Sequence, residues 1–133
     1  MRNDEWQALS ERAYGSWSRG DLDGWLDVFA PDCVFVAAGA FPDVDGEYRG
    51  HEEMRRFWRE LRAPFDSFAI VAERIEPLAA DEAVADVRFT ATGKGSGARV
   101  ELEFFHRVTA RDGRVIRLSS HETRAEALAD AGA

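Results

Sequence analysis

His106 is the side chain best placed for proton chemistry in this chain of 133 residues. It lies within residues 99–110, where apolar and polar side chains alternate as in a strand with one buried face. One alternating set is predicted to point inward, and it consists of Val100, Leu102, Phe104, His106 and Val108. Desolvation holds a buried imidazole neutral, and a neutral imidazole can donate or accept one proton. The alternative is a core histidine whose hydrogen bonds are satisfied by a nearby hydroxyl or carbonyl.

Ser120 is the hydroxyl predicted to assist His106. If a hairpin closes around residues 111–113, His106 lies opposite Leu118 and Ser120 lies diagonally nearby. These two residues, His106 and Ser120, are therefore the predicted catalytic groups.

The same register pairs Glu103 with His121 on the outer face of the sheet. A metal site of two histidines and one carboxylate requires all three ligands on one side, and His106 is predicted to point the other way. We therefore predict no metal site, and we interpret His51 as a residue at the start of a helix.

Two other features resemble reactive sites but have simpler interpretations. Cys33 is the only cysteine and lies in an apolar run, which predicts a small buried core residue. The segment 93–97, Gly-Lys-Gly-Ser-Gly, lacks the GxxxxGK[ST] spacing of a phosphate loop and is predicted to be a hairpin turn. We predict no cofactor.

The elements that position these residues change type midway along the chain. Helical spacing of apolar residues predicts three helices: one from Asp4 to Gly20, one from Asp21 to Pro31, and one at residues 54–61 that ends before Pro64. A short strand is predicted at residues 33–37, and a turn-rich loop at residues 39–46. Long antiparallel strands follow at residues 68–77, 83–92, 99–110 and 114–122, and Thr123 with Glu126 begins a short final helix that ends at Ala129.

Composition bounds the classes of function. Acidic residues outnumber basic residues 25 to 17, so the chain would repel a nucleic-acid backbone, and no nucleic-acid partner is predicted. The longest apolar stretch, residues 34–41, is too short to cross a bilayer, and the start has no apolar signal region, so we predict no membrane partner and a cytoplasmic location. One domain, residues 1–133, fits this length.

The order of elements resembles the cone-shaped α+β fold of the nuclear transport factor 2-like superfamily, in particular its SnoaL-like and ketosteroid-isomerase-like members. The resemblance covers nearly the whole chain and depends on residues 20–24 (Gly-Asp-Leu-Asp-Gly), 29–32 (Phe-Ala-Pro-Asp), 48–51 (Tyr-Arg-Gly-His), 57–58 (Phe-Trp), His106 and 112–115 (Asp-Gly-Arg-Val). It implies three N-terminal helices packed on a strongly curved antiparallel sheet, with a short C-terminal helix.

The catalytic patterns of these relatives are incomplete in this chain. The resemblance places the ketosteroid-isomerase base at Ala37 and its tyrosine at Ala13, with Tyr14 one helical step away from the required position. It places the acid of SnoaL-like cyclases near Ser119 or Ser120. The arginine and carboxylates of the epoxide-hydrolysing members would fall at residues 86–88, Asp-Val-Arg, in reversed order.

We predict that the cone encloses a site for a small hydrophobic ligand. The predicted lining residues are Trp17, Phe35, Phe57, Trp58, Val87, Phe89, Phe104 and Leu118. If the aromatic rings meet across the cone, the domain is solid and works through its surface, whereas rings that stand apart would admit a flat ligand. The chain is then a SnoaL-like isomerase, cyclase or hydratase that uses His106, or a domain that binds small molecules or proteins without catalysis.

The outer face of the sheet is predicted to pair with a second copy of the chain. It mixes both signs of charge, which suits a self-complementary contact about a two-fold axis. The residues concerned are Asp86, Arg88, Glu101, Glu103, Arg107, Arg117 and His121. SnoaL-like proteins usually dimerise through this sheet, so a homodimer is expected.

Overall fold

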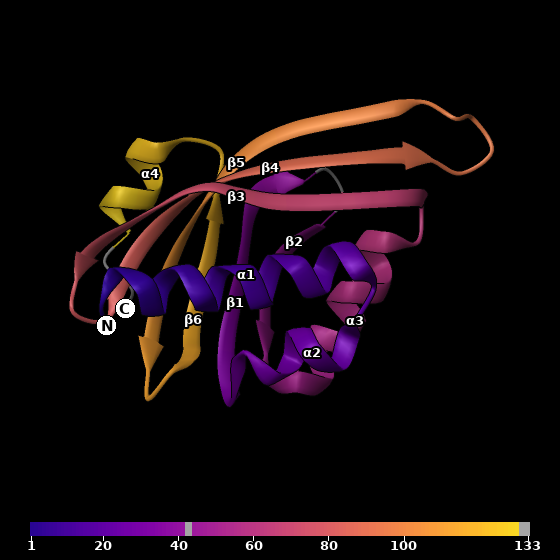
Figure 1. Ribbon diagram of the computed structural model, residues 1–133. Coiled ribbons are helices and arrows are strands. Elements are labelled where there is room, and N and C mark those ends of the chain that lie inside the picture. The colour runs from indigo at the N-terminus through magenta and orange to yellow at the C-terminus, as the bar shows by residue number, and fades with distance from the viewer. Residues whose placement is uncertain (42–43, 131–133) are drawn as a thin grey trace.

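A curved sheet of six strands is the frame of the molecule (Figure 1). The structure, a computed structural model, describes residues 1–41 and 44–130. The strand order is β2-β1-β6-β5-β4-β3, and β1 and β6 are parallel while the other described pairs are antiparallel. The strands are β1 (Phe29–Phe41), β2 (Val44–Arg49), β3 (Phe65–Ala79), β4 (Glu82–Gly93), β5 (Arg99–Arg111) and β6 (Arg114–His121).

Three helices cover the inner face of the sheet, and the fourth packs on the outer face of β4 to β6. They are α1 (Asn3–Arg19), α2 (Leu22–Asp27), α3 (Gly50–Arg62) and α4 (Arg124–Ala129). In Figure 1, α1 runs along β3, and α2 and α3 lie near the C-terminal end of α1. This is the predicted α+β architecture, with three N-terminal helices, a curved sheet and a short final helix.

Side-chain caps predicted from the sequence account for the starts of α2 and α4. The Asp21 carboxylate accepts a hydrogen bond from the Gly24 amide at 3.0 Å and so begins α2. Thr123 caps α4 in the same way through the Glu126 amide, at 3.2 Å. The first helix differs from the prediction, because Arg2 and not Asp4 occupies its N-cap position. None of the described helices is long and apolar enough to cross a membrane.

The region after α2 was predicted less well. Strand β1 begins at Phe29 and extends well beyond residue 37, and the predicted loop at residues 39–46 is largely taken up by β1 and β2. Residues 42 and 43 lie outside the described part of the chain. Pairing between β1 and β2, for example Phe35 with Tyr48, satisfies backbone groups that a loop would leave to water, and this outweighs the turn propensity of Gly46.

Candidate functional site

A buried hydrogen bond between Tyr14 and His106 is the centre of the candidate site. The Tyr14 hydroxyl lies 2.7 Å from His106 Nδ1, although the two residues are 92 positions apart in the chain. Tyr14 is 8% exposed and His106 is 5% exposed, and their rings stack with centroids 5.7 Å apart. Helix α1 supplies the phenol and β5 supplies the imidazole, so the bond joins the helical layer to the sheet.

Burial keeps both partners uncharged. It lowers the pKa of His106 from 6.5 to about 3, and the charge of His121 adds a smaller effect in the same direction. Burial also raises the pKa of the Tyr14 phenol far above its usual value of 10.0. Near neutral pH the pair is therefore a phenol beside a neutral imidazole.

The hydrogen-bond pattern determines which imidazole nitrogen carries the proton. Among the described residues, the Tyr14 hydroxyl has one hydrogen-bond partner, His106 Nδ1. If the phenol donates to Nδ1, only the Nε2–H group is left unpaired, whereas the reverse arrangement leaves both the phenol O–H and Nε2 unpaired, so we assign the imidazole hydrogen to Nε2. The Nε2–H group makes no hydrogen bond to the described residues, so it is the donor that the pair can offer to a ligand.

Ser120 lies directly opposite His106, not diagonally as predicted. The hairpin turn is the two-residue segment Asp112-Gly113, with φ of 54° and 78°, and not the longer closure assumed from the sequence. A register shift follows at Thr109 and Ala110, and it moves every later pair of β5 and β6 by one step. Leu118 consequently pairs with Val108.

A cavity of about 50 Å³ lies next to this pair, between α1 and the sheet. Its lining includes seven residues predicted from the sequence: Trp17, Phe35, Phe57, Phe104, Leu118, His106 and Ser120. Trp58, Val87 and Phe89 are buried but do not line it. Trp58 instead stacks on Trp17 with centroids 4.1 Å apart, and Phe89 packs edge-on against Phe68 at 4.5 Å.

Aromatic rings fill much of the cone beside the cavity. Trp17 contacts Trp25 with ring centroids 5.1 Å apart, and Phe35 contacts Phe57 at 4.5 Å. The Arg62 guanidinium covers this cluster, 4.8 Å from the Trp58 ring centroid. A cavity that binds benzene measures about 150 Å³, so even a one-ring ligand must displace side chains to enter this one.

The outer face carries a separate polar cluster around Asp130. His121 Nε2 lies 2.8 Å from Ser119 Oγ and 3.2 Å from the Asp130 carboxylate, which also binds Arg117. The serine and the aspartate share one imidazole nitrogen, whereas a hydrolytic triad needs them on opposite nitrogens. This cluster is thus a structural anchor for Asp130, the residue after α4.

The predicted contact between Glu103 and His121 is wrong, because the shorter turn and the register shift together pair His121 with Phe105, and Glu103 lies opposite Arg88 of β4. The described residues contain no group of three or more His, Cys, Asp or Glu side chains that could hold a metal ion. Cys33 is buried, and its sulfur contacts the Met54 sulfur at 2.9 Å. His51 bonds the Phe29 carbonyl at 3.0 Å from the start of α3.

Tyr14 is the residue that sequence reasoning missed. The prediction took Ala13 as the inward position, and both residues in fact line the cavity. The usable signal was the wide apolar stripe of α1, because Tyr14 follows Ser10 by four residues and precedes Trp17 by three, and all three are buried. A stripe that wide places two adjacent residues on the inner face.

The fold and site define a cone-shaped α+β domain with a small, mainly apolar cavity beneath its first helix. The chain belongs to the SnoaL-like domain family, whose model matches residues 10–118. Comparison with curated proteins gave no match.

Solved structures support the fold. An NTF2-like protein of unknown function from Burkholderia pseudomallei is 21% identical, with a TM-score of 0.78 over 94% of this chain and 95% of that chain. TerC, co-crystallised with polyporic acid, is 18% identical, with a TM-score of 0.78 over 92% and 94% of the two chains. A candidate SnoaL-like polyketide cyclase from Jannaschia sp. CCS1 is 21% identical, with a TM-score of 0.69 over 94% and 86%. At these identities the likeness concerns the fold.

Proposed function

We propose that this protein binds a small, uncharged, oxygenated apolar molecule and acts on it as an isomerase, cyclase or hydratase. The observation that carries the proposal is the buried pair of Tyr14 and His106 beside an apolar cavity. Among the described residues that line the cavity, none is Asp, Glu, Lys or Arg, so a charged ligand would lose its hydration without gaining an ion pair.

The chemistry that suits this pair is polarisation of a carbonyl. An imidazole with a pKa of about 3 is a weak base at neutral pH, but its Nε2–H can donate to a carbonyl oxygen. Such a donor stabilises the negative charge that develops on the carbonyl oxygen while an α-proton of the ketone passes to solvent or to a basic group of the ligand, and Tyr14 holds the tautomer in which Nε2 carries the hydrogen. Isomerisations and cyclisations next to a carbonyl pass through this kind of charge.

The printed descriptions of two similar structures support the proposal. TerC was crystallised with polyporic acid, and the protein from Jannaschia is described as a candidate polyketide cyclase. Both share the fold of this chain, and the descriptions belong to those proteins.

A ligand panel tests the proposal. One- and two-ring ketones, with hydrocarbons of the same shape as controls, are added to the protein and followed by tryptophan fluorescence and melting temperature. We expect ketones to quench the emission, because Trp6, Trp17 and Trp25 line the cavity, and to raise the melting temperature by mass action. Mass spectrometry of the same mixtures reports conversion. A panel in which no ketone shifts either signal would contradict the proposal.

A second candidate is a domain that works through its surface without a ligand. The specific observation in its favour is the packing of aromatic rings across the cone, with Trp17 and Trp58 at 4.1 Å, which leaves a cavity of only about 50 Å³. A panel in which no ligand shifts the fluorescence or the melting temperature would favour this candidate. Binding without conversion would instead favour a carrier or a sensor.

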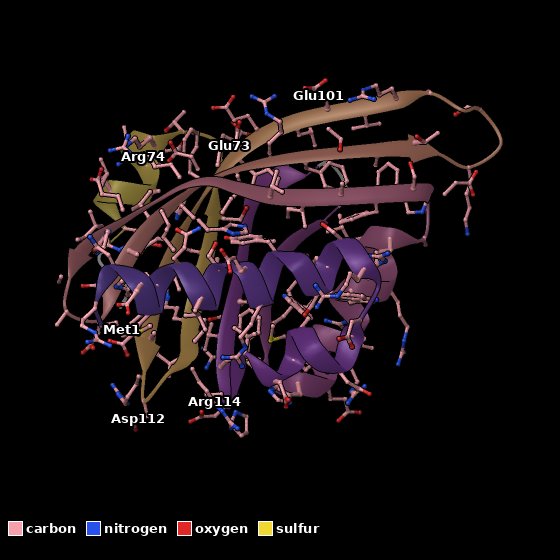
Figure 2. All side chains as sticks on the ribbon, in the orientation of Figure 1. Met1, Glu73, Arg74, Glu101, Asp112 and Arg114 are labelled. Carbon is pink, nitrogen blue, oxygen red and sulfur yellow. The ribbon has the colours of Figure 1, made fainter. Side chains whose placement is uncertain are left out.

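We also propose that the outer face of β3 to β5 joins two copies of the chain. Helix α4 and the residues after it bind the charged groups on the other half of this face, for example Arg124 with Asp86 at 2.7 Å and Arg107 with the Leu128 carbonyl at 3.1 Å. The remaining half centres on Arg88, which lies 3.1 Å from Glu73 and 3.0 Å from Glu101. Figure 2 shows Glu73 and Glu101 on the side of the sheet that faces away from α1.

Val71 offers a direct test of this dimer, because it is 53% exposed beside the Arg88 cluster. We expect light scattering at micromolar concentration to give twice the chain mass of 14.9 kDa for the native protein. Val71→Glu places like charges near a two-fold contact and should yield the monomer. The matched control is Leu128→Glu on α4, where the side chain is 44% exposed, and it should stay dimeric. A native protein with the mass of one chain would contradict the proposed dimer.

A further inference from the structure

Helix α1 presents a line of polar groups to the cavity. Trp6, Ser10 and Tyr14 follow one another at intervals of four residues, and all three line the cavity. Residues at this spacing form a ridge on the surface of a helix. The rise of about 1.5 Å per residue separates Trp6 from Tyr14 by about 12 Å along the axis, with Ser10 midway.

The Trp6 end of this ridge has no hydrogen-bond partner. The Trp6 side chain is fully buried, at 0% exposed, and its Nε1 bonds to none of the described residues. The Ser10 hydroxyl likewise makes no hydrogen bond within the described part of the chain. More than nine in ten buried polar groups in proteins are hydrogen-bonded, so an unpaired indole N–H calls for a physical explanation.

The chemistry of the ridge restricts what can satisfy it. An indole N–H only donates, so its partner must be an acceptor such as a carbonyl or ether oxygen. The Ser120 hydroxyl, across the cavity on β6, is also buried and without a partner among the described residues. The unpaired groups thus lie on both the helical and the sheet walls of a cavity whose other lining residues are almost all apolar.

We propose that Trp6 and Ser10 form a second polar subsite, which binds an acceptor oxygen of the ligand at the end of the cavity away from Tyr14. This rests on the proposed function, in which His106 binds a first oxygen. The ligand class that fits both ends is an uncharged ring compound with two acceptor oxygens on opposite sides. Specificity would then come from the Trp6 subsite, since a ligand with one oxygen leaves the indole N–H unpaired.

Three probes of nearly the same shape test this subsite: 1,4-diethylbenzene, 4-ethylacetophenone and 1,4-diacetylbenzene, which carry no, one and two carbonyl groups. We expect calorimetry to show 1,4-diacetylbenzene binding about tenfold more tightly than 4-ethylacetophenone, because one more hydrogen bond forms. Trp6→Phe should bring the ratio of the two affinities to about one, whatever its common effect on both ketones. The control Trp58→Phe, a buried tryptophan outside the cavity lining, should keep the native ratio.

A second measurement uses the native protein and does not depend on the folding of a variant. The indole N–H resonance of Trp6 should move downfield in a proton–nitrogen spectrum when 1,4-diacetylbenzene is added, and much less with 4-ethylacetophenone. Ser10→Ala should lower the ratio of diketone to monoketone affinity, whereas Ser16→Ala, on the same helix but outside the lining, should keep that ratio.

The outcomes separate the two proposals. If both ketones bind equally and the Trp6 resonance does not move, the subsite is overturned while the proposed function stands. An indole N–H satisfied by trapped water alone would give that result. If no probe binds at all, the proposed function fails and the subsite fails with it.

Discussion

Acidification from pH 7 to pH 5 is expected to cost the native protein about 2 kcal/mol of folding free energy that a His106→Gln variant does not lose. Burial lowers the pKa of His106 from 6.5 to about 3, so the folded state keeps the imidazole neutral where the unfolded chain binds a proton. The contribution of the neutral imidazole is fully present above pH 6.5. It is lost progressively as the pH falls from 6.5 toward 3, since the unfolded state binds more protons across that range.

The groups that contact His106 do not stabilise its protonated form in the folded state, so they do not offset the loss of folding free energy at low pH. Tyr14 faces His106 from α1, Ser120 from β6, and the Phe35 ring approaches edge-on at 6.4 Å from β1. None of these groups carries a negative charge near neutral pH. Among the described residues, His121 is the charged group that acts on the imidazole, and it further disfavours protonation.

Urea unfolding at pH 7 and at pH 5 measures the effect. The quantity to compare is the difference in unfolding free energy between the two pH values, in the native protein and in His106→Gln. His51→Gln serves as the control, since its imidazole lies at the start of α3, and it should retain the native pH dependence. Equal slopes for the native protein and His106→Gln would show that the imidazole is not buried as the structure has it.

The sequence was sufficient to orient His106 but not to identify its partners. Alternation along β5 places the imidazole on the inner face because successive side chains of a strand must point to opposite sides. The partner across β6 depends on one irregularity near Ala110, which the two-residue turn at Asp112-Gly113 does not reveal. The two-residue turn and this irregularity each move the register by one position, and together they replace Leu118 by Ser120 opposite His106.

The rotation of α1 was only partly accessible to sequence reasoning. The width of the buried stripe admits both Ala13 and Tyr14 on the inner face, but how far Tyr14 turns toward His106 depends on how Trp6 and Trp17 pack. The openness of the cone also depends on ring orientations, such as the 28° stacking of Trp17 on Trp58. Orientations of this kind follow from tertiary packing and leave no mark on residue spacing.

Once a turnover assay exists, His106→Leu is expected to lower kcat by about 10²–10³ for a ketone substrate, while His106→Gln lowers it only about tenfold. Leucine removes the Nε2–H donor from beside the cavity, whereas the glutamine amide can still donate to the carbonyl oxygen but cannot accept a proton as a base. Tyr14→Phe should lower kcat about tenfold, because the tautomer that places the hydrogen on Nε2 is then no longer fixed.

The difference in kcat between His106→Leu and His106→Gln shows whether His106 acts as a hydrogen-bond donor or as a base. If His106 removed a proton from the substrate, glutamine and leucine would be equally inactive, and equal losses would contradict the donor role. Melting curves of His106→Leu and His106→Gln check that each variant is folded. This check is required because leucine leaves the buried Tyr14 hydroxyl without its partner and glutamine replaces that partner. A kcat that stays constant between about pH 5 and pH 9 in the native enzyme is the accompanying expectation, because burial moves the pKa of His106 below that range and the pKa of Tyr14 above it.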